Sequence, residues 1–130
     1  MPSNEPSPGS PHDWLRLADA DLALAIHGGD AGFLRELLCF HAQQAAEKAF
    51  KSVLVAKGLA VPRTHNLGTL LHDLPTGILC PDVVASSTGL TEYAVASRYP
   101  GLHEPVLEDE YREAMAIAQA VVDWARQIVG

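Results

Sequence analysis

Residues 34–57, LRELLCFHAQQAAEKAFKSVLVAK, form the most informative stretch of the chain. The pattern predicts a helix that begins between Ala31 and Leu34 and continues to Lys57, where Gly58 ends it. Apolar residues recur along one face at helical spacing. They are Leu38, Ala42, Ala45, Ala49, Val53 and Ala56. Because alanine side chains are small, this stripe predicts close approach of a second helix.

A helical pattern also precedes this stretch, and another closes the chain. The first opens at Asp13, which can act as its N-cap, and runs to Ile26 or His27, where Gly28 and Gly29 are expected to stop it. The last runs from about Glu108 to Val129, with acidic residues in its first turn, where the helix dipole favours anions.

Two shorter helices are expected between the long ones. Thr64 to Leu67 has the composition of a helix start, and the helix should continue to Leu74 before Pro75. A further candidate covers Asp82 to Ser97, but Gly89 argues against one unbroken helix there.

No segment alternates with the period of two that marks a β-strand. The sequence therefore predicts an all-α fold, an antiparallel up-and-down bundle of four to five helices. Residues 13–130 should form this domain. Residues 1–12 are rich in proline and serine, which predicts a disordered tail.

The chain of 130 residues carries 9 basic and 16 acidic side chains, a net charge of −7 with neutral histidines. This balance argues against a protein that coats nucleic acid or anionic membrane through charge alone. Residues 35–63 hold five basic and two acidic residues, so a local cationic site is compatible with the overall charge. No DNA or membrane partner is expected.

The cysteine pattern is typical of a cytoplasmic protein. Cys39 and Cys80 both lie in apolar surroundings and are expected to be buried thiols. The sequence shows neither a signal peptide nor an apolar run long enough to span a bilayer. Neither does it contain an HExxH motif or a carboxylate and histidine cluster, so no metal and no cofactor are predicted.

The segment from Arg98 to His103, RYPGLH, is the strongest local candidate for chemistry. Pro100 and Gly101 fit the central positions of a type II turn, which would bring the flanking residues together. A guanidinium that binds phosphate beside an imidazole that moves a proton can cleave RNA without a metal. Alternatively, Arg98 covers the carbonyls of a helix end and His103 is an exposed loop residue.

A polar ridge on the second predicted helix is another candidate. His41, Gln44 and Lys48 lie on one side of it, in a ridge that continues to Lys51, and could face a cleft or bind a phosphate, or they could form a solvated helix face. Asp21 falls on the apolar face of the first helix, where its carboxylate must find a partner, line a cleft or reach water at the rim.

Four blocks of sequence resemble the HEPN domain of prokaryotes. They are DWL with DL at 13–15 and 21–22, CFHAQQAAEKA at 39–49, PRTHNL at 62–67 and ASRYPG at 96–101. They occur in the order expected for that family and span nearly the whole of residues 13–128. The resemblance implies a helical bundle that commonly forms a homodimer and is often encoded beside a minimal nucleotidyltransferase, as a toxin and antitoxin pair.

The resemblance also implies an activity. Catalytic members of the family are metal-independent endoribonucleases whose arginine and histidine meet at a dimer cleft, and Arg98 and His103 match these two positions. Two hypotheses follow. In one, the protein is a ribonuclease, of toxin type, that uses Arg98 and His103. In the other, it is a non-catalytic module that binds a nucleotide or a partner nucleotidyltransferase.

Overall fold

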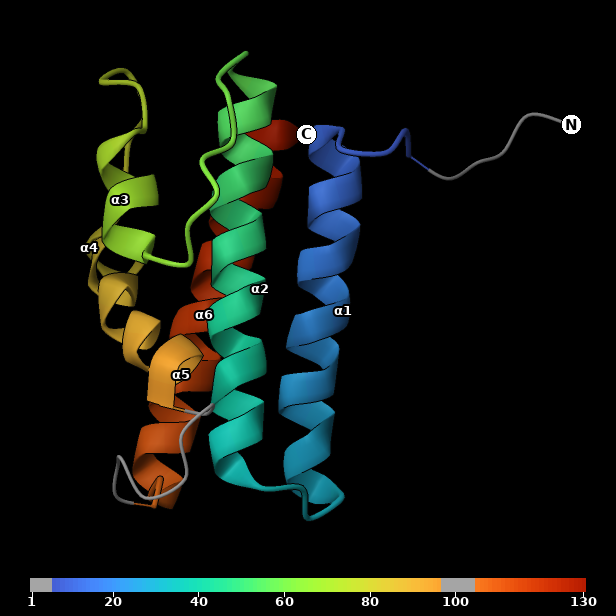
Figure 1. The fold of residues 1–130 in the computed structure, drawn as a ribbon, viewed down its shortest axis with the longest axis vertical. Coiled ribbons are helices and arrows are strands. Elements are labelled where there is room, and N and C mark those ends of the chain that lie inside the picture. The colour runs from blue at the N-terminus through green and yellow to red at the C-terminus, as the bar shows by residue number, and fades with distance from the viewer. Residues whose placement is uncertain (1–5, 97–104) are drawn as a thin grey trace, which may run out of the picture.

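The structure, a computed structural model, describes residues 6–96 and 105–130, and all regular elements in these ranges are helical. Three long helices run the length of the molecule (Figure 1). They are α1 (Pro11–Asp30), α2 (Arg35–Ala56) and α6 (Glu108–Val129). Short helices α3 (Leu67–His72), α4 (Asp82–Ala85) and α5 (Thr91–Ala96) form a fourth segment, with a 3₁₀ turn at Ser86–Leu90 between the last two.

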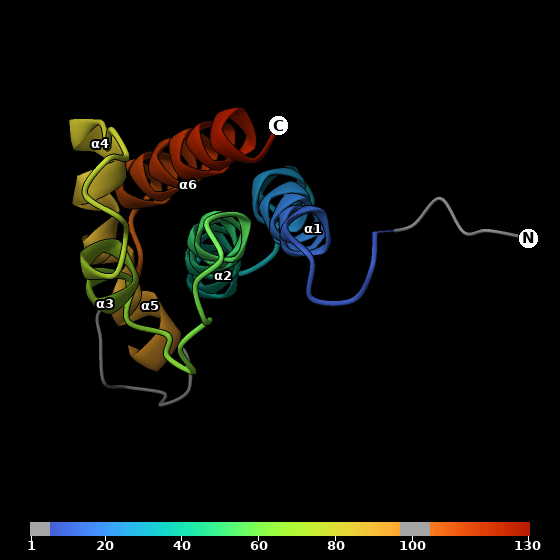
Figure 2. The same ribbon diagram turned by 90° about the horizontal axis from the view of Figure 1, so that it is seen from above.

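The four segments alternate in direction, which confirms the predicted up-and-down bundle. In Figure 1, α1 and the stretch from α4 to α5 run downward, whereas α2 and α6 run upward. The short α3 follows a descending loop and itself points upward. Figure 2 shows α2 between α1 and the α3–α5 segment, with α6 packed beside it. Because α2 has neighbours on several sides, it supplies much of the core.

The alanine stripe of α2 lies in this core. Leu38, Ala42, Ala45 and Ala49 are fully buried or nearly so, which confirms the predicted close helix contact. Ala56, at the last turn, is instead exposed, because the helix extends beyond its neighbours there. Among the described residues, Phe50 is the largest side chain that is fully buried, and its ring centroid lies 5.4 Å from that of Trp124 on α6. These contacts join α2 and α6 into one core.

Helix α1 is longer at both ends than the sequence suggested. It begins at Pro11 rather than Asp13, because Ser10 is its N-cap and accepts a hydrogen bond from the Asp13 N–H at 3.2 Å. The helix therefore includes the last two residues of the expected tail. Residues 1–5 of that tail lie outside the described residues.

Gly28 and Gly29 do not stop α1, which continues to Asp30. Both glycines are packing positions. A Cβ on Gly28 would lie 2.5 Å from Leu38 Cδ2, and one on Gly29 would lie 2.5 Å from Tyr111 Oη. At both positions a neighbouring side chain occupies the space that a Cβ would need. Glycine has no Cβ and therefore fits inside the helix at these two places.

The other boundaries agree closely with the sequence. Helix α6 spans Glu108–Val129 as predicted, and Asn66 caps α3, where its side chain accepts from two backbone N–H groups. The element expected at Asp82–Ser97 is broken into two short helices and the 3₁₀ turn at Ser86–Leu90, which contains Gly89, so the prediction against one unbroken helix was correct. Ser97 itself lies outside the described residues.

The start of α1 and the end of α6 lie side by side (Figure 1). His12 Nε2 is 2.9 Å from the carbonyl oxygen of Gly130, and Arg126 forms an ion pair with Asp19. The turn between α1 and α2 and the start of α6 lie at the opposite end of the bundle.

Candidate functional site

Asp21, His41 and Lys48 meet between α1 and α2, and we call them the Asp21 cluster. Oδ1 of Asp21 lies 3.0 Å from Nδ1 of His41, and Oδ2 lies 2.5 Å from Nζ of Lys48. The two partners are two helical turns apart on α2 and hold the carboxylate between them. The Asp21 side chain is 13% exposed, so its burial is compensated by a cation.

This geometry answers one of the questions left open by the sequence. The Asp21 carboxylate finds partners instead of reaching water at a rim. Three of the four residues predicted to face a cleft or bind phosphate are thus brought together. Because Lys48 already donates to Asp21, an incoming phosphate would have to compete with this carboxylate. Phosphate binding at these residues stays a prediction.

Gln44, the fourth of these residues, belongs to a second polar network centred on Glu47. The carboxylate of Glu47 lies 2.9 Å from Nζ of Lys51 and 2.8 Å from Nδ1 of His65. Gln43 also donates to Glu47, at 3.4 Å, and to the backbone carbonyl of His65, at 2.9 Å. Gln44 donates to Gln43 at 2.7 Å. This network attaches the segment before α3 to α2.

The Glu47 network corrects the interpretation of the α2 ridge as a solvated face. Gln43, Glu47 and Lys51 are buried, with residue exposures of 0%, 3% and 7%. Nζ of Lys51 also lies 5.5 Å from the ring centroid of Trp14, within the range of a cation–π contact. The part of the polar side around Glu47 is therefore covered by other parts of the chain, whereas His41, Gln44 and Lys48 are partly exposed. Its charges pair internally, as buried charges must.

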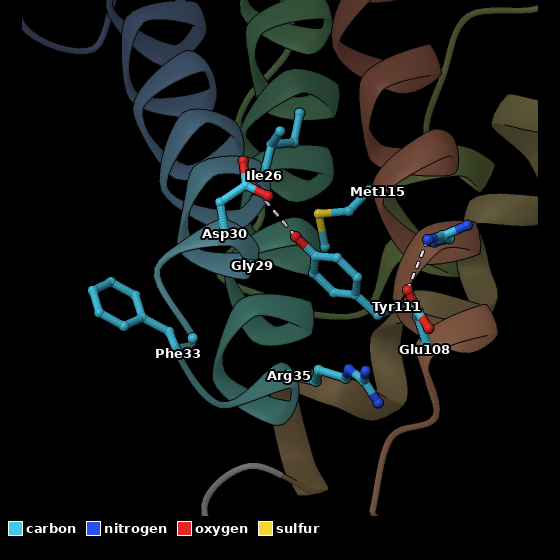
Figure 3. Close-up of a pocket in the computed structure, with 10 residues that line it drawn as sticks. Ile26, Gly29, Asp30, Phe33, Arg35, Glu108, Tyr111 and Met115 are labelled. Atoms are coloured by element: carbon cyan, nitrogen blue, oxygen red, sulfur yellow. Dashed lines mark hydrogen bonds and ion pairs between the residues drawn. The ribbon is translucent and has the colours of Figure 1, made fainter.

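A cleft of about 600 Å³ opens at the end of the bundle where α1, α2 and α6 meet (Figure 3). We call it the end cleft. Its lining includes Gly29, Asp30, Phe33, Arg35, Glu108 and Tyr111. The Tyr111 hydroxyl donates to the carbonyls of Ala25, at 2.7 Å, and Ile26, at 3.2 Å, which fixes its ring against α1.

The sequence alone did not identify the end cleft. Its residues come from three segments, and the glycines near it looked like a helix stop. Asp30 and Phe33 lie at the connection from α1 to α2, whereas Tyr111 comes from the opposite end of the chain. The one available signal was the presence of an arginine and an aromatic residue, Arg35 and Phe33, close to Gly32. Such a pattern is too common to assign a site.

The chain that leads into α6 contacts α2 near this cleft through two long hydrogen bonds. The N–H of Val106 donates to Oε1 of Glu36 at 3.3 Å, and Nη1 of Arg35 donates to the Val106 carbonyl at 3.4 Å. Two consecutive side chains of α2 therefore hold one residue of the backbone before α6. Arg98 and His103, the predicted catalytic pair, lie outside the described residues, and so does the turn expected at Pro100 and Gly101.

Within residues 6–96 and 105–130, no group of three metal-binding side chains comes together. In the same ranges, no helix is long and apolar enough to cross a membrane. Cys39 is fully buried as predicted, but Cys80 is only partly buried. Burial, together with the nearby charges of Glu36 and Glu110, raises the pKa of the Cys39 thiol to about 12.

The raised pKa of Cys39 predicts a loss of stability in alkaline solution. The thiol ionises near pH 9 in the unfolded chain and near pH 12 in the folded one. Stability that depends on the neutral thiol is therefore complete below about pH 9 and is lost as pH rises toward 12, by up to about 1.4 kcal/mol per pH unit. Guanidinium unfolding at about pH 8 and about pH 10.5 should show a smaller pH effect in Cys39→Ala than in the wild type. Equal losses in both proteins would contradict this assignment.

Comparisons with known proteins agree with this fold. A family model described as HEPN domain matches residues 11–128. TT1696 from Thermus thermophilus is 32% identical, with a TM-score of 0.82 over 92% of this chain and 98% of that protein. ST0689, an archaeal HEPN homologue, is 29% identical, with a TM-score of 0.74 over 93% and 98%. No curated protein matches the chain. The chain belongs to the HEPN domain family.

Proposed function

We propose that this HEPN domain is a metal-independent endoribonuclease that acts as the toxin of a toxin and antitoxin pair, and that Arg98 and His103 carry its activity. Family membership supports the proposal, because the arginine and histidine of catalytic members match these two residues. We also propose a homodimer in which the two copies of this segment share a cleft.

The observation that carries the proposal is the match of the HEPN family model over residues 11–128, a span that includes Arg98 and His103. The spacing of these two residues in the sequence fits the arginine and histidine of catalytic members. An imidazole and a guanidinium supply the acid–base group and the phosphate-binding group that cleavage of RNA requires.

The proposed reaction needs only these two side chains and RNA. The 2′-oxygen of the ribose bonds to phosphorus while the bond from phosphorus to the 5′-oxygen breaks. His103 takes the proton from the 2′-hydroxyl or supplies one to the leaving oxygen. The guanidinium of Arg98 stabilises the negative charge on the phosphate in the transition state.

The test is cleavage of RNA by the purified full chain. We expect the wild type to cleave RNA, also in the presence of EDTA, and the Arg98→Ala, His103→Ala double variant to be at least about 100-fold slower. The His72→Ala variant is the matched control, because His72 is exposed on α3. Equal cleavage by the wild type and the double variant would refute these catalytic assignments.

A second candidate function is a non-catalytic module that docks a nucleotidyltransferase or binds a nucleotide. It is favoured by exposed apolar side chains around the end cleft, which we call the end patch. Phe33, Leu34, Leu37 and Leu107 are 49–66% exposed there, and Ile26 is 36% exposed. Exposed apolar side chains that occur at one end of a molecule often mark protein interfaces.

Co-expression with a nucleotidyltransferase encoded beside this gene would test the docking function. We expect Leu34→Glu to prevent co-purification, whereas Leu79→Glu should not. Leu79 is 86% exposed and borders a cavity formed with the far ends of α2 and α6. Co-purification of the Leu34→Glu variant at the wild-type level would exclude the end patch as the docking surface.

A further inference from the structure

The floor of the end cleft is flat and rigidly held. Tyr111 provides its ring, which two hydrogen bonds to α1 carbonyls fix in place. Gly29 lies against this ring so closely that a Cβ there would be 2.5 Å from Tyr111 Oη. Met115 adds an apolar side chain beside it (Figure 3). A volume of about 600 Å³ over such a floor suits a planar ligand of nucleotide size.

An aromatic side chain lies at the rim of this cleft, with its ring directed away from Tyr111 and Arg35 (Figure 3). Phe33 lies on the connection between α1 and α2, and 55% of its surface is exposed. Proteins bind unpaired bases of RNA by stacking them on aromatic rings, each stack being sequence-tolerant. Phe33 therefore offers a stacking surface to a base in the folded protein as it stands.

The polar groups of the cleft divide it into an accepting side and a donating side. Asp30 lies near the Tyr111 hydroxyl, and its charge contributes, after burial and the charge of Cys39, to the raised pKa of that tyrosine. None of the ion pairs found in the described part of the chain involves Asp30. Opposite it, Arg35 donates only a long bond of 3.4 Å to the carbonyl of Val106.

The remaining charges of the cleft are already matched. Arg112 pairs with Glu108 at 2.7 Å along one face of α6. The carboxylate of Asp30 and the guanidinium of Arg35 are thus the pair available to a ligand. A ligand that complements them has adjacent N–H donors at one end and a phosphate at the other.

We propose that the end cleft binds a guanine nucleotide of a single-stranded RNA. The base stacks on Phe33, the Asp30 carboxylate accepts its N1–H and its exocyclic amino group, and Arg35 binds the adjacent phosphate. Guanine alone among the four bases presents two neighbouring donors on this edge, which match the two carboxylate oxygens. The inference rests on the proposed ribonuclease function, for which it names the preferred base.

Binding of uncleavable RNA tests this site separately from catalysis. A short 2′-O-methyl RNA with a single guanine among uracils is titrated into the full chain, and fluorescence anisotropy is recorded. The matched RNA has adenine in place of guanine. We expect about tenfold tighter binding of the guanine RNA, since the adenine edge offers the carboxylate a single donor group.

Three variants assign the roles. Asp30→Asn should remove the preference for guanine, because the amide replaces one of the two acceptor oxygens by an NH2 donor, which then faces a donor of guanine. Arg35→Gln should weaken both RNAs by a similar factor of about ten, as loss of a phosphate contact does. Phe33→Ala should weaken both by about five- to tenfold, through loss of stacking. Lys57→Ala, at the far end of α2, is the control, and thermal melting confirms that each variant is folded.

The outcomes separate the two proposals. Guanine preference that Asp30→Asn abolishes supports the site even if natural RNA is not cleaved, and in that case only the proposed ribonuclease function fails. Equal binding of the two RNAs by the wild type overturns the site even if RNA is cleaved. A guanine preference that Asp30→Asn leaves intact also overturns it.

Discussion

Replacing Glu47 by alanine is expected to lower the free energy of unfolding by about 3–5 kcal/mol, because it leaves Lys51 buried without its partner. The Lys51 side chain is only 9% exposed, and Glu47 Oε2 lies 2.9 Å from its ammonium group. The same change removes the acceptor for His65 and Gln43. Urea or guanidinium unfolding monitored by circular dichroism measures the loss.

The chain contains a matched control for this prediction. Arg112 and Glu108 form an ion pair with the same spacing of four residues, but their side chains are 73% and 57% exposed. Glu108→Ala should therefore change stability by less than about 0.5 kcal/mol. A double variant, Glu47→Leu with Lys51→Met, should recover much of the stability lost by Glu47→Ala, since no charge stays buried. Similar losses in the free energy of unfolding for Glu47→Ala and Glu108→Ala would show that burial of an ion pair does not increase the cost of removing one partner.

Phe50→Ala is expected to cost about 3–5 kcal/mol through loss of buried contacts and creation of a cavity. Phe50 is fully buried, and its ring lies 5.4 Å from that of Trp124, between α2 and α6. The cavity would lie between the two helices that share the core. Tryptophan emission should also shift to longer wavelength as water gains access to Trp124.

Phe33→Ala removes the same side chain from a position that is 55% exposed. Its cost should be below about 1 kcal/mol, since most of the ring is already in contact with water. Thermal melts of the two variants give the comparison directly. If Phe33→Ala were as damaging as Phe50→Ala, the core would have to extend over the end of the bundle.

The sequence predicts the helices well wherever local signals and burial act together. The sequence predicts α6 from about Glu108 to Val129, in agreement with the structure, because acidic residues mark its start and the apolar period of a helix continues to Val129. The apolar face of α2 is predicted for the same reason, and the start of α3 lies at the end of the predicted entry at Thr64 to Leu67. In these helices, the local signals for the helix ends and the apolar periodicity indicate the same bounds.

Contacts between distant segments explain the errors. The polar arc of α2 looks solvated in sequence, but the chain around His65 covers it and provides hydrogen bonds for Gln43 and Glu47. Gly28 and Gly29 look like a helix stop, although the space for a side chain is taken up by Leu38 and Tyr111. Helix periodicity carries no information about which segment will lie opposite a given face.

The residues of the candidate sites also differ in how far the sequence predicts them. Asp21 was recognised because a carboxylate on an apolar face requires a partner, and the structure supplies His41 and Lys48. The end cleft has no signal in the sequence, because Asp30, Arg35 and Tyr111 converge only after folding. Arg98 and His103 were identified by spacing and by resemblance, and their roles stay a prediction that the cleavage assay will decide.

The contact between His12 and the carbonyl of Gly130 shows that the start of α1 and the end of α6 are adjacent in space. A short linker from Gly130 back to Ser10 should close the chain, so that new ends can be opened in the loop between α2 and α3. A tag or a further domain joined at Ser10 or Gly130 would project from the end of the bundle opposite the end cleft. Such fusions leave the cleft open, and immobilisation through these positions should present it to the solution in one orientation.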